Sequence, residues 1–230
     1  MLGEVMRTST KSPRLSGFTL VELMVVLAVV AVLLFVAAPS FRELMVAQRV
    51  RGTSDQFLTD VQFARSEAAS RQEVVGITFK PPLASMSCYT IHTCGSVAPA
   101  NCTCDCSAAV GSRCPAVSLA NPDPPREVRT VQLKPQDGVS LIPVALNGNP
   151  LPGFFTNPSH ITFDPNTGGL TSYYAVGLVL VPKPPGGSFW AKTSSTITGS
   201  TVVIRDIVNK AGRPSSCKPV GSSIGGLPAC

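Results

Sequence analysis

The stretch that decides the fold lies near the N-terminus and reads Gly17-Phe18-Thr19-Leu20-Val21-Glu22, followed by an apolar run to Ala38. Among the 21 residues from Phe18 to Ala38, Glu22 carries the only charged side chain. A helix needs about 20 apolar residues to cross a bilayer, so residues 18–38 predict a transmembrane or filament-core helix. A carboxylate in such a helix costs about 2.5–3.5 kcal/mol near the centre and less towards an end. Glu22 is therefore a candidate functional residue.

The segment before this run is short and basic. Together the two resemble the type IV prepilin signature, which is a basic leader, a glycine, Phe-Thr-Leu-x-Glu and an apolar helix. The resemblance implies that a prepilin peptidase removes residues 1–17 by cleaving after Gly17, and that the new amine of Phe18 is methylated. The apolar helix then stays in the mature protein, whereas the apolar region of a secretory signal is removed. The alternative is an ordinary single-span anchor.

Glu22 follows Phe18 by four residues, about one helical turn, so the new amine and the carboxylate can meet within one chain. The resemblance implies a different contact, in which Glu22 meets the amine of a neighbouring subunit and sets the axial register during assembly. The partners it implies are other pilins or pseudopilins through the N-terminal helix, the prepilin peptidase and an inner-membrane assembly platform. The alternative for Glu22 is an interfacial carboxylate that reaches the lipid headgroups.

Cysteines indicate where the large C-terminal part resides. Basic residues are balanced on the two sides of the apolar run, so they do not decide its orientation. An even number of cysteines in an exported domain predicts disulfides. We therefore expect a cytoplasmic N-terminus, one pass through a bacterial inner membrane and a periplasmic domain. The disulfide candidates are Cys88, Cys94, Cys102, Cys104, Cys106, Cys114, Cys217 and Cys230.

Most of the pairing cannot be read from the sequence. Cys217 and Cys230 would close a short loop, worth about 3 kcal/mol in the chain-entropy model. Cys102, Cys104 and Cys106 are separated by single residues, which would strain a bond between neighbours. That spacing is also shorter than zinc sites favour, and His92 is the nearest imidazole. We therefore expect neither a metal site nor a cofactor.

The apolar run is followed by Pro39, which predicts a helix kink. Residues 39–72 then predict an amphipathic continuation of the same helix. Its apolar face consists of Val46, Val50, Phe57, Val61, Ala64 and Ala68. One long helix to about Arg71 is the expected result.

Residues 73–230 predict a β-rich periplasmic domain. Short β-branched or alternating segments predict strands at residues 74–79, 126–133, 139–146, 161–163, 173–181 and 201–208. Residues 84–127 form a Cys-rich insert, expected as disulfide-stapled loops outside the core, and Trp190 is expected in a loop. Strands that follow one helix without alternating helices predict an α+β fold with a largely antiparallel, disulfide-stapled sheet. The resemblance to type IV prepilins implies that this fold is pilin-like.

A second resemblance is carried by Ala64-Arg65-Ser66-Glu67-Ala68 and, late in the chain, by Val202-Val203-Ile204 and Gly212-Arg213. These segments are similar to the helix end and the last strand and tail of the GspH/FimT group of pilin-like proteins. The resemblance implies a structural minor pilin or pseudopilin. Such a subunit is incorporated at low abundance, near the tip of a type IV pilus or a type II secretion pseudopilus.

Two other functions remain open. The first is a DNA-binding pilin for natural transformation, with Arg205, Lys210, Arg213 and Lys218 as phosphate contacts. The group's Gly-Arg-x-Arg tail motif lacks its second arginine here, no aromatic residue accompanies these cations in the sequence, and the net charge of +6 is modest. The second is a major, filament-forming pilin, against which the bulky insert argues.

Catalysis has no support in the sequence. His92 and His160 belong to no nucleophile–base motif, so we do not expect an enzyme. Asp164-x-Asn166-x-Gly168 is superficially similar to a calcium loop but lacks the distal glutamate.

Overall fold

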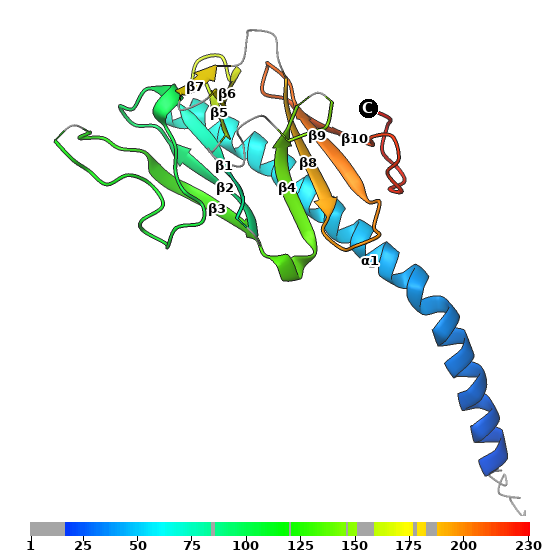
Figure 1. The fold of residues 1–230 in the computed structure, drawn as a ribbon. Helices are drawn as coiled ribbons and strands as arrows, with labels where there is room; N and C mark the ends of the chain where they lie inside the picture. The colour runs from blue at the N-terminus through cyan, green and yellow to red at the C-terminus, as the bar shows by residue number, and fades with distance from the viewer. Residues whose placement is uncertain are drawn as a thin grey trace, which may run out of the picture. The chain divides into compact units, whose positions relative to one another are not determined.

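The computed structural model describes residues 17–83, 86–119, 121–145, 147–150, 159–176, 179–182 and 188–230. Among these residues the chain forms one long helix, α1 (Leu20–Arg71), and ten strands, which can be followed in Figure 1. The strands are β1 (Val75–Leu83), β2 (Met86–Thr93), β3 (Arg126–Leu133), β4 (Val139–Val144), β5 (Ser159–Phe163), β6 (Leu170–Val176), β7 (Val179–Pro182), β8 (Phe189–Ser195), β9 (Val203–Val208) and β10 (Pro214–Cys217). The chain divides into two compact units between Arg42 and Glu43. The long helix on antiparallel sheets confirms the α+β, pilin-like fold class.

The first unit consists of the start of α1 and the residues before it. The expected leader lies outside the described residues, apart from Gly17. All side chains from Phe18 to Val36 are exposed. By length and composition no single helix among the described residues qualifies as a membrane span, but Leu20–Val36 and Phe41–Arg71 qualify as a pair. Helix assignment continues through Pro39, and the kink there stays a prediction.

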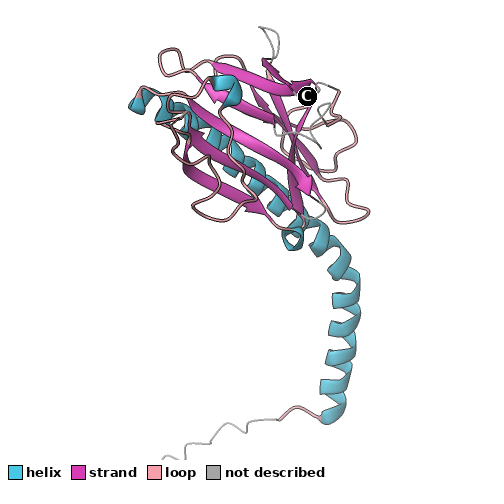
Figure 2. Cartoon of the chain, turned by 60° about the vertical axis from the view of Figure 1, so that its left-hand side comes forward, coloured by secondary structure: helices cyan, strands magenta, loops and turns pink. Residues whose placement is uncertain are grey.

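The second unit is built on the amphipathic half of α1. The six predicted face residues are all buried, which confirms that stripe: Val46, Val50, Phe57, Val61, Ala64 and Ala68. The stripe belongs to the same apolar clusters as residues of the two sheets, and Figures 1 and 2 show this part of α1 lying against the sheets. Asp60, which lies between Phe57 and Val61 in the sequence, is also fully buried.

Two antiparallel sheets complete this unit. The larger has six strands in the order β3-β2-β1-β5-β6-β7, and the smaller has four in the order β10-β9-β8-β4. Phe57 of α1 meets Phe79 of β1 and Tyr89 of β2 edge to face, and Phe79 stacks on Phe189 of β8. These aromatic contacts tie the helix and both sheets into one core.

A smaller apolar cluster lies at the other end of the buried stripe. Val46 and Val50 pack there with Val139, Ile204 and the tail residue Ile224. The tail also accepts a hydrogen bond from the Arg51 guanidinium at the carbonyl of Gly225. The last residues of the chain are therefore part of the packed domain.

The central strand β2 was not predicted. We expected residues 84–127 to be loops outside the core, and this is wrong for Met86–Thr93, which pairs with both β1 and β3. Strand periodicity is present, because Tyr89 and Ile91 point into the core while Cys88, Thr90 and His92 alternate with them. The cysteine and serine content concealed that alternation.

Three further differences concern where strands lie and where they end. Trp190 lies on β8 rather than in a loop, where its neighbours Phe189 and Ala191 are buried. Residues 173–181, expected as one strand, contribute to two paired strands, β6 and β7. β1 also continues to Leu83, through Pro81 and Pro82 and past the expected end at residue 79, and its register with β2 shifts between Lys80 and Leu83. Proline is tolerated where a ladder is irregular.

Candidate functional site

The N-terminal motif begins the helix. Gly17, Phe18 and Thr19 have no regular secondary structure and are exposed, and α1 starts at Leu20. The Glu22 backbone N–H donates to Thr19 Oγ1 at 3.2 Å, and the Leu23 N–H donates to the Thr19 carbonyl at 3.1 Å. Thr19 is thus the N-cap, and a Thr followed three residues later by Glu is the sequence of a capping box.

Two features of this geometry suit processing and assembly. The Gly17–Phe18 bond lies in exposed, non-helical chain directly before the cap, so a peptidase can reach it without unwinding α1. Glu22 lies in the first turn of the helix, where a negative charge is favoured by the helix dipole. Phe18 and the Glu22 carboxylate therefore lie at the same end of the helix.

Comparison with known families identifies this segment. Residues 14–38 match the prokaryotic N-terminal methylation motif. The match supports a type IV pilin-like protein that is processed by a prepilin peptidase and assembles with other pilins. With its apolar helix, the motif also supports membrane anchoring. No curated protein and no solved structure matches the chain.

All eight cysteines are paired in the structure. The pairs are Cys88–Cys106, Cys94–Cys102, Cys104–Cys114 and Cys217–Cys230. No bond joins Cys102, Cys104 and Cys106 to one another, and Cys217 closes the tail with Cys230, as the spacing predicts.

A loop, residues 94–125, covers the outer face of the six-stranded sheet and is held there by one disulfide, while two further disulfides lie within the loop. Cys106 is bonded to Cys88 of β2, and its carbonyl accepts a hydrogen bond from the Gln132 amide of β3. The Pro99 carbonyl lies 2.8 Å from His160 Nε2 of β5. An ion pair joins Lys80 of β1 to the loop. The Cys-rich insert thus contributes both an inner strand of the sheet, β2, and the loop at residues 94–125 that covers this strand.

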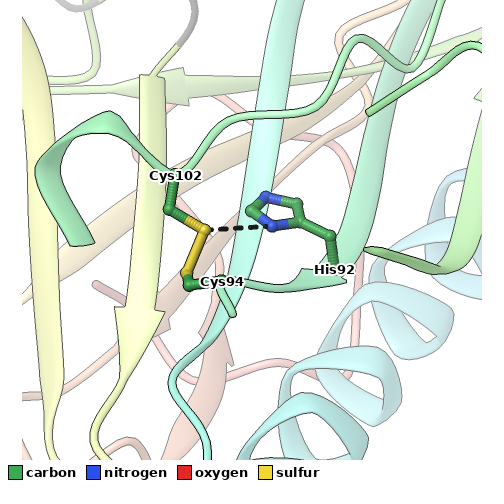
Figure 3. Close-up of side chains that lie close together, drawn as sticks. All are labelled: His92, Cys94 and Cys102. Carbon is green, nitrogen blue, oxygen red and sulfur yellow. Dashed lines mark hydrogen bonds between the residues drawn. A yellow bond between two sulfur atoms is a disulfide. The ribbon is translucent and has the colours of Figure 1, made fainter. Parts of the chain in front are cut away.

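Both histidines are buried beneath this cover. Burial lowers the pKa of His92 to about 3 and that of His160 to about 4. His92 Nε2 lies 2.7 Å from the Thr78 hydroxyl on β1, and Nδ1 lies 3.4 Å from Cys102 Sγ. In Figure 3 the His92 ring faces the Cys94–Cys102 disulfide. The imidazoles are therefore neutral at ordinary pH.

Two buried carboxylates join α1 to the sheets. Asp60 of α1 accepts a hydrogen bond from the Tyr89 hydroxyl at 2.6 Å, and Arg129 Nη1 of β3 lies 2.7 Å from its Oδ1. Asp206 of β9 accepts hydrogen bonds from the hydroxyls of Ser54 of α1 and Thr193 of β8. Burial raises the pKa of Asp60, and it raises the pKa of Asp206 to about 6.

The structure separates the four candidate DNA-contacting cations into two groups. Arg205 lies on β9 and pairs with Cys217 of β10, and Lys218 directly follows Cys217 in the sequence. Lys210 and Arg213 lie in the turn between β9 and β10 and are exposed. The sequence suggested no aromatic partner, but Arg205 Cζ lies 5.6 Å from the centre of the Trp190 ring. Lys192 of β8 is the direct cross-strand neighbour of Arg205.

Arg65 of α1 contacts two turns of the domain, and one of them contains Gly212-Arg213 of the second resemblance. A Cβ added to Gly212 would lie 3.1 Å from Arg65 Cδ, and one added to Gly168 would lie 2.7 Å from its Nε. Both glycines have positive φ, 72° and 63°. The helix end, the β5–β6 turn and the β9–β10 turn thus meet at one side chain. Asp164 stabilises the β5–β6 turn through hydrogen bonds from Asn166 and Thr167.

Proposed function

We propose that this type IV pilin-like protein is a minor pilin or pseudopilin of the GspH/FimT type. The methylation motif at residues 14–38, continued by a helix whose second half is buried in a disulfide-linked domain, is the observation that carries the proposal. In this role the exposed apolar start of α1 packs with the helices of other subunits, and Glu22 meets the amine of a neighbour.

The proposal includes a route to the filament. The precursor lies in a bacterial inner membrane with its N-terminus in the cytoplasm and its C-terminal domain in the periplasm. Prepilin peptidase cleaves after Gly17, Phe18 is methylated, and the assembly platform then transfers the subunit into a type IV pilus or type II secretion pseudopilus. The four disulfides support an oxidising compartment for the domain.

Low abundance near the tip is supported by the loop at residues 94–125. Val110, Val117 and Leu119 in this loop are highly exposed. A bulky surface loop is difficult to repeat in every subunit of a dense helical filament, whereas a terminal subunit has open space beside it. The major-pilin alternative is therefore disfavoured.

Quantitative mass spectrometry of sheared filaments tests this function. We expect the protein to be present far below the principal subunit and filaments to become fewer when its gene is deleted. Equal abundance with the principal subunit would identify a major pilin instead. Absence from filaments, with normal filament number after deletion, would overturn the structural role.

DNA binding is the second candidate function, favoured by one contact. Trp190, Lys192 and Arg205 lie together on adjacent strands of the four-stranded sheet, and the guanidinium lies over the indole ring. Aromatic and cationic side chains together suit nucleic acid, because bases stack and phosphates pair with cations. It ranks second because the modest net charge demands no polyanionic partner.

A further inference from the structure

We propose that His92, Cys94 and Cys102 form a zinc-binding site when the Cys94–Cys102 disulfide is reduced. The site goes beyond the proposed filament function. The sequence did not predict it, because the short spacing of Cys102, Cys104 and Cys106 argued against zinc. It depends on a histidine at the end of β2 that the fold places beside the first disulfide of the covering loop.

The three ligand atoms are already gathered. His92, Cys94 and Cys102 each offer one donor atom, and these atoms all lie within 4.8 Å of one another. Figure 3 shows the imidazole facing the disulfide, with His92 Nδ1 3.4 Å from Cys102 Sγ. Imidazole nitrogen and thiolate sulfur are the ligands that zinc prefers, at about 2.0–2.1 Å and about 2.3 Å. Short movements of the three side chains would reach those distances.

The imidazole is held in place by its surroundings. His92 Nε2 lies 2.7 Å from Thr78 Oγ1, a pair in which either atom can donate, and Nδ1 lies 3.4 Å from both the Thr93 carbonyl and Cys102 Sγ. When the imidazole carries its proton on Nε2, the Thr78 hydroxyl accepts it and the Nδ1 lone pair is available to a metal ion. Gly76 is opposite His92 in the sheet, and a Cβ there would lie 2.6 Å from His92 Cε1. A ligand histidine whose other nitrogen is hydrogen-bonded is the usual arrangement in metal sites.

The redox step determines when the site exists. A dithiol reductant supplies two electrons and two protons to the Cys94–Cys102 bond and itself becomes a disulfide, leaving two thiols. Zinc binding then releases both protons, since thiolates are the ligands. Three protein ligands leave one tetrahedral position for water, as in open zinc sites. The same residues therefore hold the start of the loop to β2 in both redox states.

Zinc-protected alkylation of the full-length protein in detergent tests the proposal. The protein is reduced with a phosphine, incubated with Zn²⁺ alone, alkylated and mapped by mass spectrometry. We expect zinc to slow alkylation of Cys94 and Cys102 about tenfold or more. Cys104 and Cys114 are the matched control, because they form a disulfide of similar span outside the three-residue group. They should show no such protection.

Two variants test whether His92 is a zinc ligand and whether its hydrogen bond to Thr78 strengthens zinc binding. His92→Gln should abolish zinc protection while the oxidised variant still forms the Cys94–Cys102 bond, which reports its fold. Thr78→Val removes the partner of Nε2 and should weaken zinc affinity by about 10–100-fold, the usual range for such second contacts.

Three outcomes would overturn the proposal. They are no protection of Cys94 and Cys102 in the reduced wild type, equal protection of Cys104 and Cys114, or undiminished protection in His92→Gln. The wild-type measurement decides the question even if a variant fails to fold.

Discussion

The hydroxyl of Thr19 accepts a hydrogen bond from the backbone N–H of Glu22 and thereby caps α1. This contact gives a structural reason for a threonine at position 19, because the donor is a backbone N–H and the acceptor is the threonine side chain. Thr19 separates the non-helical residues Gly17 and Phe18 from the helix that begins at Leu20. Glu22 lies in the first turn, about one turn after Phe18, the N-terminal residue of the mature protein under the proposed cleavage.

Processing should depend on Gly17. We expect Gly17→Ala to accumulate as an uncleaved precursor in the inner membrane, because a side chain at the cleavage position obstructs the peptidase. N-terminal sequencing of the mature wild type should begin at a methylated Phe18. A mature chain that starts at any other residue would contradict the assignment of the cleavage site.

Assembly should depend on Glu22 more than membrane insertion does. Glu22→Ala makes the helix more apolar, so membrane levels should hold or rise, while incorporation into sheared filaments should fall. Thr19→Ser, which keeps the capping hydroxyl, is a control for changes at the helix start and should assemble normally. Wild-type levels of Glu22→Ala in filaments would refute the pairing of Glu22 with a neighbour's amine.

Oxidised protein should contain no free thiol. Alkylation without reduction should label none of the eight cysteines, and peptide mapping should recover the four pairs.

Replacing both Cys217 and Cys230 by serine should lower the free energy of unfolding by about 3 kcal/mol, the chain-entropy value for a loop of this length. Denaturant unfolding of the oxidised proteins measures this difference, and an unchanged midpoint would mean that packing of Ile224 alone secures the tail.

Asp206 should make stability depend on pH. Its folded pKa of about 6 lies above the ordinary 3.8, so its ionisation disfavours the folded state. The stability linked to this group should be full below pH 3.8 and lost as pH rises through about 6, a change of about 2–3 kcal/mol. Asp55 adds to the shift, whereas the hydrogen bonds from Ser54 and Thr193 oppose it.

Comparison of unfolding curves from pH 4 to pH 7.5 isolates the Asp206 contribution. Asp206→Asn should reduce the decline in stability over this window, whereas Ser54→Ala should steepen it by removing a bond to the ionised form. Asp60, whose pKa is also raised, contributes in the same direction to all three proteins. Parallel curves for wild type and Asp206→Asn would show that Asp206 does not titrate in this range.

DNA binding should be weak and electrostatic if it occurs at all. We expect no gel shift at physiological salt, because the tail motif lacks one arginine. At low salt, the slope of log affinity against log salt should be about −0.9 per phosphate contact, and Arg213→Gln should reduce it by about one. Tight binding that is abolished by Arg213→Gln would favour the DNA-uptake function. Loss with Trp190→Ala instead would locate the interface on the four-stranded sheet.

The sequence by itself determined the long N-terminal helix of this protein and the face that it buries. The motif at residues 17–22 and the apolar stripe from Val46 to Ala68 are local patterns. A helix forms between residues three and four positions apart, so its start and its buried face can be read along the chain. The pairing of Cys217 with Cys230 was predictable for the same reason, because few residues separate them.

Only the tertiary structure decided which distant residues meet. β2 has the alternation of a strand, but the cysteine and serine content concealed it, and its position beside β1 and β3 is decided only by pairing. Burial of Asp60, the contact between Trp190 and Arg205, and the approach of His92 to Cys102 also depend on segments that lie far apart in the sequence. A strand makes its hydrogen bonds with other segments of the chain, so the neighbours of its side chains are fixed only when the sheet is assembled.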